Sequence, residues 1–240
     1  MIIGGFQKFT MLDYPEKVAA TVFTVGCNFR CPYCHNPEIV DPKLIDYDRA
    51  LDEKEIFDFL EGRKGSLDGV CITGGEPTLQ SGLVEFIKKI KEMGFLIKID
   101  TNASHSNVVK HLLNEDLVDY WAIDVKTVPE KYKIMTKKED VVKNIEQSID
   151  MITQSRSELE LRTTVVSGYA ILDDFDKIID WINGINKDAF SKLHRYSIQN
   201  FRPEKTLNSD LGKVLPCQEE YLEKISNKMK KICDNVIIVG

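Results

Sequence analysis

Three cysteines lie close together in residues 27–34, where their side chains could share one inorganic centre. Cys27, Cys31 and Cys34 have the spacing C-x3-C-x2-C. Such a loop can present three thiolates to one group, and thiolates are the ligands that hold iron–sulfur clusters. These clusters usually take four cysteines, and no fourth cysteine lies nearby in the sequence. The spacing therefore predicts a [4Fe–4S] cluster with one iron open to a ligand that is not a side chain.

Two other uses of these cysteines stay open at this point. Together with His35, the three thiols could bind a structural zinc ion as a Cys3His site, although Cys34 and His35 are adjacent and poorly placed to reach one tetrahedral ion. A disulfide framework needs an oxidising compartment and a dense, even set of cysteines. The chain has six cysteines in 240 residues, and the remaining three, Cys71, Cys217 and Cys233, are scattered. We expect these three to be structural.

Composition excludes several classes of function. The net charge is −6, from 32 basic and 38 acidic residues, which argues against a broad nucleic-acid-binding surface. No apolar run approaches the ~20 residues that span a bilayer. The first residues, 1–5, lack the basic start and apolar centre of a signal peptide. We therefore expect a cytoplasmic protein, and the reducing cytoplasm also keeps thiolates available for iron.

Strand-like and helix-like segments alternate along the chain. Apolar and β-branched runs predict strands over 18–25, 70–73, 95–99, 117–123, 159–166, 194–198 and 236–239. Amphipathic spacing predicts helices over 52–62, 83–93, 106–114, 139–154, 173–185 and 218–233. Residues 1–17 are predicted to be an N-terminal extension of turns, and residues 129–138 an irregular insertion.

This alternation indicates parallel βαβ units in one sheet. About six such units predict an α/β fold, an incomplete (β/α)6 barrel of the TIM type. No shift in composition marks a second domain, so we expect one domain over residues 1–240, with 201–240 adding a C-terminal helix and strand.

Polar motifs follow the predicted strands directly, and the carboxyl ends of barrel strands form the active-site mouth. The motifs are the cysteine loop, Gly74-Gly75-Glu76-Pro77, Asp100-Thr101-Asn102, Asp124-Val125-Lys126 and Gln199, with Arg162 inside a strand. Each also has an ordinary structural explanation. Glycines and Asp/Asn form turns, Asp124 and Lys126 could be an exposed ion pair, and Arg162 could pair with Glu160 or Asp124.

The cysteine loop resembles the C-x3-C-x-aromatic-C signature of the radical S-adenosylmethionine (SAM) superfamily, with Tyr33 as the aromatic residue. The continuation through His35-Asn36-Pro37 resembles one branch more closely, as do Gly5-Phe6-Gln7-Lys8 and Asp13-Tyr14-Pro15. This branch is the activating enzymes of glycyl-radical enzymes, above all the activating protein of anaerobic ribonucleoside-triphosphate reductase. The resemblance extends over about residues 5–203.

The resemblance implies a SAM site. It places Gly74, Gly75 and Glu76 at the amino group of SAM, with Glu76 as the anionic partner. It assigns the ribose and carboxylate region to Asp100, Asn102, Asp124, Lys126 and Arg162, and the adenine to Tyr33. Gln199 falls near the adenine or ribose, where relatives carry a different polar residue. In some relatives, Asp100, Thr101 and Asp124 would also line a monovalent-cation site.

The implied activity is reductive cleavage of SAM to a 5′-deoxyadenosyl radical, which takes a hydrogen atom from a glycine of a partner enzyme. The implied electron donor is a flavodoxin or ferredoxin. Three alternatives stay open: an activator of pyruvate formate-lyase or another glycyl-radical enzyme, a radical SAM enzyme acting on a small molecule such as a deazapurine synthase, and a non-catalytic binding module stabilised by zinc or a cluster.

Overall fold

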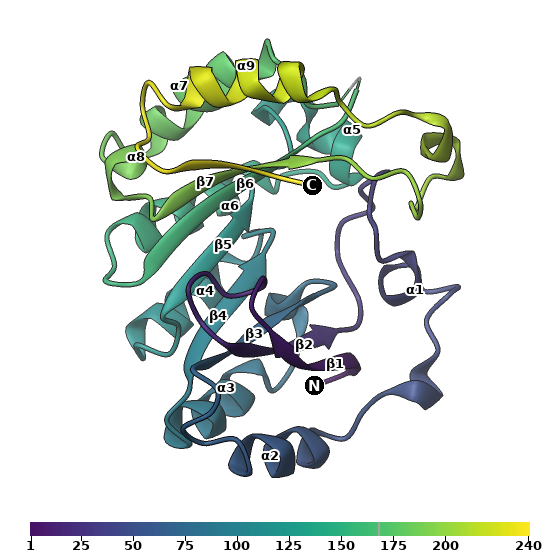
Figure 1. Ribbon diagram of the computed structural model, residues 1–240, viewed down its shortest axis with the longest axis vertical. Coiled ribbons are helices and arrows are strands. Elements are labelled where there is room, and N and C mark those ends of the chain that lie inside the picture. Colours follow the sequence, from purple (N-terminus) through teal and green to yellow (C-terminus); the bar gives the residue numbers. More distant parts are fainter. Residues whose placement is uncertain (168) are drawn as a thin grey trace.

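Eight strands form one sheet in which the spatial order follows the chain from β1 to β8. The computed structural model describes residues 1–167 and 169–240. The strands are β1 Ile3–Thr10, β2 Ala19–Thr24, β3 Gly69–Gly74, β4 Leu96–Thr101, β5 Tyr120–Asp124, β6 Glu158–Val165, β7 Arg195–Asn200 and β8 Val236–Val239. Figure 1 shows the sheet bent into an arc with helices along its outer side. Each strand from β2 to β8 runs parallel to its neighbour, and β1 is antiparallel to β2.

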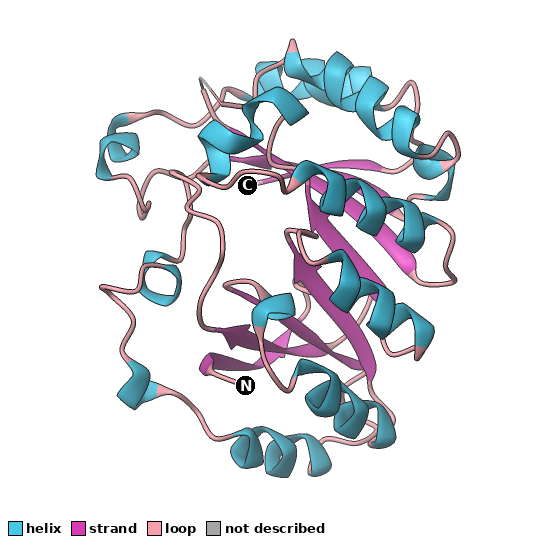
Figure 2. Ribbon diagram, turned by 180° about the vertical axis from the view of Figure 1, so that it is seen from behind, coloured by secondary structure: helices cyan, strands magenta, loops and turns pink. Residues whose placement is uncertain are grey.

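The connections between parallel strands contain the helices, and the longer ones cover the outer face of the sheet (Figure 2). The α-helices are α1 Pro37–Val40, α2 Glu53–Glu61, α3 Leu83–Glu92, α4 Ser106–Asn114, α5 Tyr132–Thr136, α6 Val142–Thr153, α7 Asp174–Ile185, α8 Ala189–Lys192 and α9 Glu219–Met229. Short 3-10 helices are η1 Tyr47–Arg49, η2 Pro77–Leu79, η3 Pro129–Lys131 and η4 Ser209–Lys213. The predicted incomplete α/β barrel is confirmed.

Local sequence explains these elements. The Asp52 side chain accepts a hydrogen bond from the Lys54 backbone N–H and so caps α2. The apolar stripe of α3, which includes Phe86, Ile87 and Ile90, is fully buried. Such a stripe holds a helix against the sheet because burial removes apolar surface from water.

The inner face of the sheet is polar and charged, in contrast to the apolar outer face. Lys98, Asp100, Glu160 and Arg162 come from β4 and β6, and their side chains are engaged with one another or with neighbouring strands. Alternating residues of a strand point to opposite faces, so each strand supplies apolar residues to the helices and polar residues to the barrel interior. The interior is therefore suited to a polar ligand.

Three predictions about elements need correction. Residues 1–17 are not turns throughout, because residues 3–10 form β1, an edge strand with mixed exposure and a register shift beside Gly5. The irregular insertion 129–138 contains η3 and α5. Gln199 does not follow its strand but lies within β7. Among the residues that the structure describes, no helix is long and apolar enough to cross a membrane.

Candidate active site at the carboxyl ends of the strands

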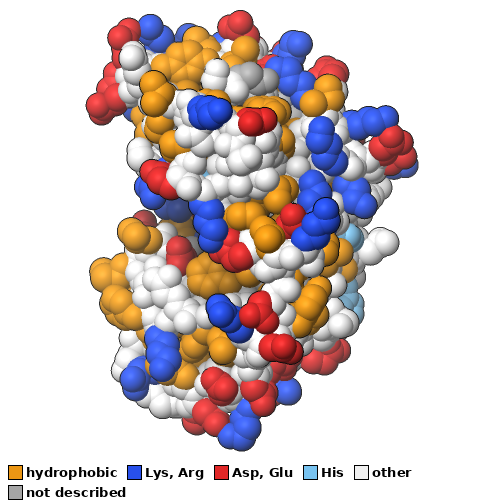
Figure 3. Space-filling view, turned by 90° about the vertical axis from the view of Figure 1, so that its right-hand side faces the viewer, with side chains coloured by type: hydrophobic (Ala, Val, Ile, Leu, Met, Phe, Trp, Pro, Cys, Tyr) orange, Lys and Arg blue, Asp and Glu red, His pale blue; other side chains and the backbone are white. Residues whose placement is uncertain are grey.

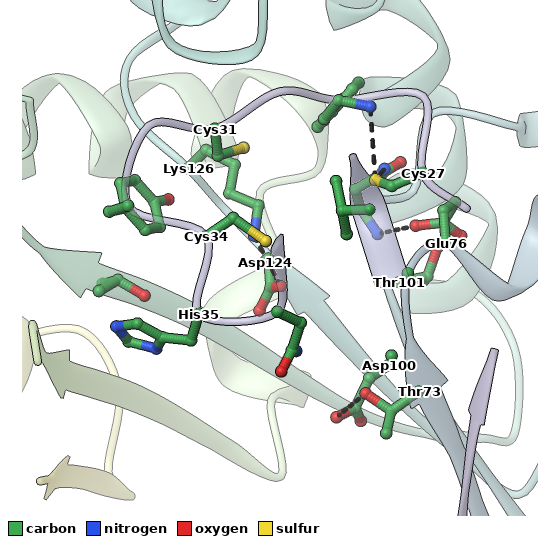
Figure 4. Close-up of a pocket in the computed structure, with 18 of the residues that line it drawn as sticks. Cys27, Cys31, Cys34, His35, Thr73, Glu76, Asp100, Thr101, Asp124 and Lys126 are labelled. Carbon is green, nitrogen blue, oxygen red and sulfur yellow. Dashed lines mark hydrogen bonds and ion pairs between the residues drawn. The ribbon is translucent and has the colours of Figure 1, made fainter. Parts of the chain in front are cut away.

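A cavity of about 240 Å³ opens at the carboxyl ends of the strands, and all the residues predicted for the site line it. Figure 4 shows the three thiol groups around one space, with Asp124 and Lys126 beside it and Asp100 farther away, next to Thr73. The predicted residues in the lining are Cys27, Cys31, Tyr33, Cys34, Gly74, Gly75, Glu76, Asp100, Asn102, Asp124, Lys126, Arg162 and Gln199. The structure therefore brings together motifs that are up to 172 residues apart, from position 27 to position 199.

The cysteine loop is held on one side by residues near its start. Arg30 folds back, and its guanidinium donates to the backbone carbonyls of Cys27 and Phe29, the first at 2.6 Å and the second at 2.8 Å. The Arg30 backbone N–H donates to the Thr136 carbonyl at the end of α5 at 2.9 Å. These bonds fix the turn between the first two cysteines and attach it to the wall of the barrel.

A C-terminal segment holds the other side of the same loop. The backbone N–H of Leu207 donates to the Cys34 carbonyl at 3.1 Å, and that of Asn208 donates to the Pro32 carbonyl at 2.9 Å. His35 lies 2.9 Å from the Arg202 carbonyl through Nε2, and its ring stacks on Phe201. The His35 imidazole is thus engaged with the C-terminal segment and not with the thiols.

The three thiols have the chemistry that an iron–sulfur cluster requires. All are free of disulfides, and soft thiolates suit iron–sulfur clusters. Burial, reinforced by Glu76, raises the pKa of Cys27 to about 12, and burial raises the pKa of Cys31 to about 11 and that of Cys34 above its ordinary value. The thiols are therefore protonated without metal, and coordination must displace these protons. Among the described residues, no three His, Cys, Asp or Glu side chains are placed so that they could bind one single metal ion.

The two glycines after β3 permit a close approach between two segments of backbone. A Cβ on Gly75 would lie 2.0 Å from the Gly26 carbonyl oxygen, and one on Gly74 would lie 2.7 Å from the Thr24 backbone. Gly74 also has a φ of +104°, a backbone conformation that residues other than glycine rarely adopt. These glycines therefore allow the start of the cysteine loop to pack directly against the end of β3.

We expect Gly75→Ala to reduce cluster content sharply, because the new methyl group displaces Gly26 and the loop that follows it. The accompanying loss in the free energy of unfolding should be about 1–3 kcal/mol, as in other overpacked sites. Iron per chain after anaerobic reconstitution and urea unfolding measure the two effects. Gly184→Ala in α7 is the matched control, since its Cβ meets nothing within 4 Å. Equal iron in both variants would contradict this explanation.

Glu76 is buried, with 1% of its surface exposed, and its carboxylate is fully engaged by the protein. Oε1 accepts hydrogen bonds from the Thr78 hydroxyl and backbone and from the Thr101 hydroxyl, and Oε2 accepts from the Asn102 backbone N–H at 2.8 Å. Glu76 thereby joins the end of β3 to the end of β4. Its expected contact with the amino group of SAM stays a prediction.

Paired charged side chains of alternating sign line the cavity, and Lys98, which does not line it, extends the row. Arg162 donates to Asp124 through Nε at 2.8 Å and to Asp100 at 2.9 Å. Lys126 donates to Asp124 at 2.8 Å, and Lys98 pairs with Asp100. Burial opposes ionisation of both carboxyl groups, but Arg162 and the neighbouring lysine outweigh it and lower the pKa of Asp100 and of Asp124. All five groups are therefore charged at neutral pH, and cations outnumber anions by three to two.

The remaining predicted residues have distinct surroundings. The Tyr33 hydroxyl is buried and has no hydrogen-bond partner among the described residues, and the Lys126 ammonium lies 5.9 Å from its ring centre. Such an unpaired hydroxyl fits a bound polar ligand. Gln199 accepts from Thr164 at 3.1 Å. The cation site expected at Asp100, Thr101 and Asp124 stays a prediction. In this structure both carboxylates accept hydrogen bonds from Arg162, and the Thr101 hydroxyl donates to Glu76.

Several residues at the site were not identified from the sequence. Asn28 and Ser104 contact Asn102 beside Cys27, and residues 207–208 support the cysteine loop. For Asn28, its place directly after Cys27 was the available signal. Residues 207–208 lie beyond the region of family resemblance and carry no chemical signal in the sequence.

Comparisons with known proteins agree with this arrangement. The sequence matches the radical SAM superfamily over residues 21–182. It is 34% identical, over 99% of this chain and 95% of the relative, to a protein of Methanocaldococcus jannaschii provisionally named a glycyl-radical enzyme activating enzyme. It is 29% identical to a pyruvate formate-lyase-activating enzyme of Staphylococcus aureus, over 75% of this chain and 76% of that one.

A solved structure supports the fold. QueE from Escherichia coli has a TM-score of 0.59 at 15% identity, and the match covers 99% of this chain and 92% of QueE. Proteins of this superfamily use a [4Fe–4S] cluster and SAM. The match over residues 21–182 and the similarity along the whole chain lead to one conclusion: the chain belongs to the radical SAM superfamily and, within it, to the family of glycyl-radical-enzyme activating enzymes.

Proposed function

We propose that this enzyme installs a glycyl radical on an anaerobic ribonucleoside-triphosphate reductase. The observation that carries the chemistry is that three free thiols line one open cavity together with four paired charged side chains, those of Asp100, Asp124, Lys126 and Arg162. The choice of partner rests on the resemblance of 5–8, 13–15 and 33–37 to activators of that reductase. Residues 5–8 lie in β1, and Asp13 and Pro15 line a second cavity that shares Asp100, Arg162 and Gln199 with the first.

In this proposal Cys27, Cys31 and Cys34 would hold the cluster, with SAM bound beside it in the same cavity. A reduced cluster, when bound, supplies the electron that splits SAM into methionine and a 5′-deoxyadenosyl radical. Arg162 and Lys126 place positive charge where the SAM carboxylate lies. Asp124 accepts hydrogen bonds from both side chains and so balances part of their positive charge. Arg162 and Lys126 can therefore orient the SAM carboxylate without strong repulsion between the two cations.

The residues of the wall have further roles in this proposal. Tyr33 offers its unpaired hydroxyl and ring to the adenine. Gly74 and Gly75 leave backbone accessible at the amino group of SAM, while Glu76 holds the two strand ends together. Asp100 and Asp124 hold the Arg162 guanidinium in place, and Gln199 lies toward the nucleoside. The protein thus binds and orients SAM, while the cofactor performs the bond cleavage.

The outer face of the site is consistent with a protein substrate. Figure 3 shows a hollow in this side of the molecule with side chains of both charges around it. A flexible loop of a partner can enter such a hollow, and the deoxyadenosyl radical then takes one hydrogen atom from a glycine Cα. This step yields 5′-deoxyadenosine and a glycyl radical. The electron consumed for each SAM comes from a one-electron donor, for which we propose a flavodoxin or ferredoxin.

The decisive experiment is an anaerobic assay of the reconstituted, reduced enzyme with SAM and each of two candidate partners, the reductase and pyruvate formate-lyase. We expect a glycyl-radical signal in electron paramagnetic resonance with the reductase, and transfer of deuterium from a Cα-deuterated glycine into 5′-deoxyadenosine. A reductase in which that glycine is replaced by alanine is the control. A signal with pyruvate formate-lyase alone would favour the second candidate, which the similarity to the Staphylococcus aureus enzyme supports. Label in a small molecule alone would reject both.

A further inference from the structure

A closed ring of side-chain hydrogen bonds lies beside Cys27. Asn102 Nδ2 donates to Asn28 Oδ1 at 2.9 Å, Asn28 Nδ2 donates to Ser104 Oγ at 2.8 Å, and Ser104 Oγ donates to Asn102 Oδ1 at 2.6 Å. Each residue donates once and accepts once in the same direction, so the bonds strengthen one another. Asn102 and Ser104 are buried, and Asn28 joins the ring from the cysteine loop.

The ring determines which way the Asn102 amide points. The Ser104 backbone N–H also donates to Asn102 Oδ1, at 3.0 Å. Because a backbone N–H can only donate, the amide oxygen must face Ser104 and the amide nitrogen must face the cysteine loop. This nitrogen carries two hydrogens. One goes to Asn28, and the Cys27 sulfur lies 3.9 Å from the same nitrogen in position for the other.

The segment that carries Asn102 is held in place by hydrogen bonds that its backbone makes with Glu76 and with α6. The Asn102 backbone N–H donates to Glu76 at 2.8 Å. Two residues of α6 bind the following carbonyls: Ser148 Oγ donates to Ala103 O at 2.8 Å, and Asn144 Nδ2 donates to Ser104 O at 3.1 Å. The Asn102 amide therefore keeps its orientation whether or not a ligand fills the cavity.

We propose that Asn28, Asn102 and Ser104 are positioning residues that direct an amide N–H at the Cys27 sulfur and so raise the reduction potential of the cluster. N–H donors to cluster sulfurs stabilise the electron-rich reduced form. The Phe29 backbone N–H, 3.4 Å from the same sulfur, adds a second donor. One premise rests on the proposed function, namely that Cys27 is a cluster ligand. Asn102 then acts on the cluster, a role distinct from its predicted contact with SAM.

The test is the midpoint potential of the reconstituted full-length protein, measured by redox titration with electron paramagnetic resonance detection in the absence of SAM and partner. Asn102→Ala removes the donor. We expect the ratio of reduced to oxidised cluster at a fixed potential to fall about tenfold, which is a shift of about 59 mV for one electron. Ser104→Ala removes the hydroxyl from the ring but leaves the backbone N–H that donates to Asn102 Oδ1. The Asn102 amide is then held less firmly, and we expect a smaller shift in the same direction.

Ser106→Ala is the matched control, because it removes a buried serine hydroxyl that donates to Gln147 and takes no part in the ring or in the bonds that hold the Asn102 segment. We expect its potential to equal that of the wild type. If Asn102→Ala fails to retain iron, Ser104→Ala decides the question. Unchanged potentials in the ring variants, or an equal shift in Ser106→Ala, would overturn the proposal but leave glycyl-radical formation untouched, since the measurement uses no partner. A wild-type chain without a [4Fe–4S] cluster would overturn both.

Discussion

Replacing Cys27, Cys31 and Cys34 together with alanine is expected to abolish both the cluster and the formation of 5′-deoxyadenosine. Each thiolate is one of three protein ligands in the proposed site, and the other cysteines lie elsewhere in the fold, with Cys71 buried inside β3. Iron content, visible absorbance and chromatographic detection of 5′-deoxyadenosine after reduction with SAM present measure the loss. We expect each single alanine variant to lose the activity as well.

Cys71→Ala serves as the control for this experiment. Cys71 is fully buried among strand residues, so its removal should cost some stability and leave the iron content unchanged. SAM cleavage by the triple variant would end the assignment of these cysteines as ligands. Iron loss in Cys71→Ala equal to that in the triple variant would show that iron content reports on folding and not on coordination.

Arg162→Met is expected to have the second largest effect, because it leaves two partly buried carboxylates short of a positive partner. Removing one partner of a buried ion pair typically costs 3–5 kcal/mol. We expect a loss of about 3 kcal/mol, at the low end of that range, because Lys98 and Lys126 still pair with Asp100 and Asp124. Affinity for SAM should also fall, and urea unfolding and equilibrium binding of SAM measure the two effects separately.

The pH dependence of this loss follows from the ion pairs. In the wild type the folded-state pKa values of Asp100 and Asp124 are lowered, so their contribution to stability is present above the unfolded value of about 3.9 and lost as pH falls below it. The stability difference between wild type and Arg162→Met should therefore stay nearly constant from pH 7 to about pH 4 and shrink as the pH falls further. A difference that does not change with pH would indicate lost packing alone.

Arg195→Met separates this effect from the general loss of an arginine in the barrel. Arg195 lies 3.0 Å from Glu160, which also accepts from Tyr120 and Ser197, and it does not line the cavity of the cysteines. We expect it to leave the affinity for SAM unchanged. Equal loss of SAM affinity in both variants would contradict the role of Arg162 at the carboxylate.

The sequence predicted the parallel strands and the mouth of the barrel because both depend on local patterns. A buried strand such as β2 is a continuous apolar run, and the polar residues that follow such runs meet at one end of the sheet. In contrast, β1 has mixed exposure and two adjacent glycines, so neither alternation nor an apolar run marks it. Its place depends on pairing with β2, which is a tertiary contact.

The hydrogen-bond partners of the site residues could not be predicted from the sequence either, because they are also tertiary contacts. Nothing local indicates that Glu76 accepts from residues 101 and 102, or that Arg162 joins Asp100 to Asp124. Of the two partners considered for Arg162, Asp124 is correct, and Glu160 is bound by Tyr120 and Ser197 instead. Residue types showed which chemistry the site contains, but not which side chains hold one another in place.

The support of the cysteine loop by residues 207–208 has a consequence for how the enzyme matures. During synthesis the cysteine loop leaves the ribosome early, whereas residues 207–208, which support it, emerge about 170 residues later. Iron delivered to the nascent chain would meet a loop without its final shape. Cluster insertion should therefore follow translation of the barrel, in a separate maturation step.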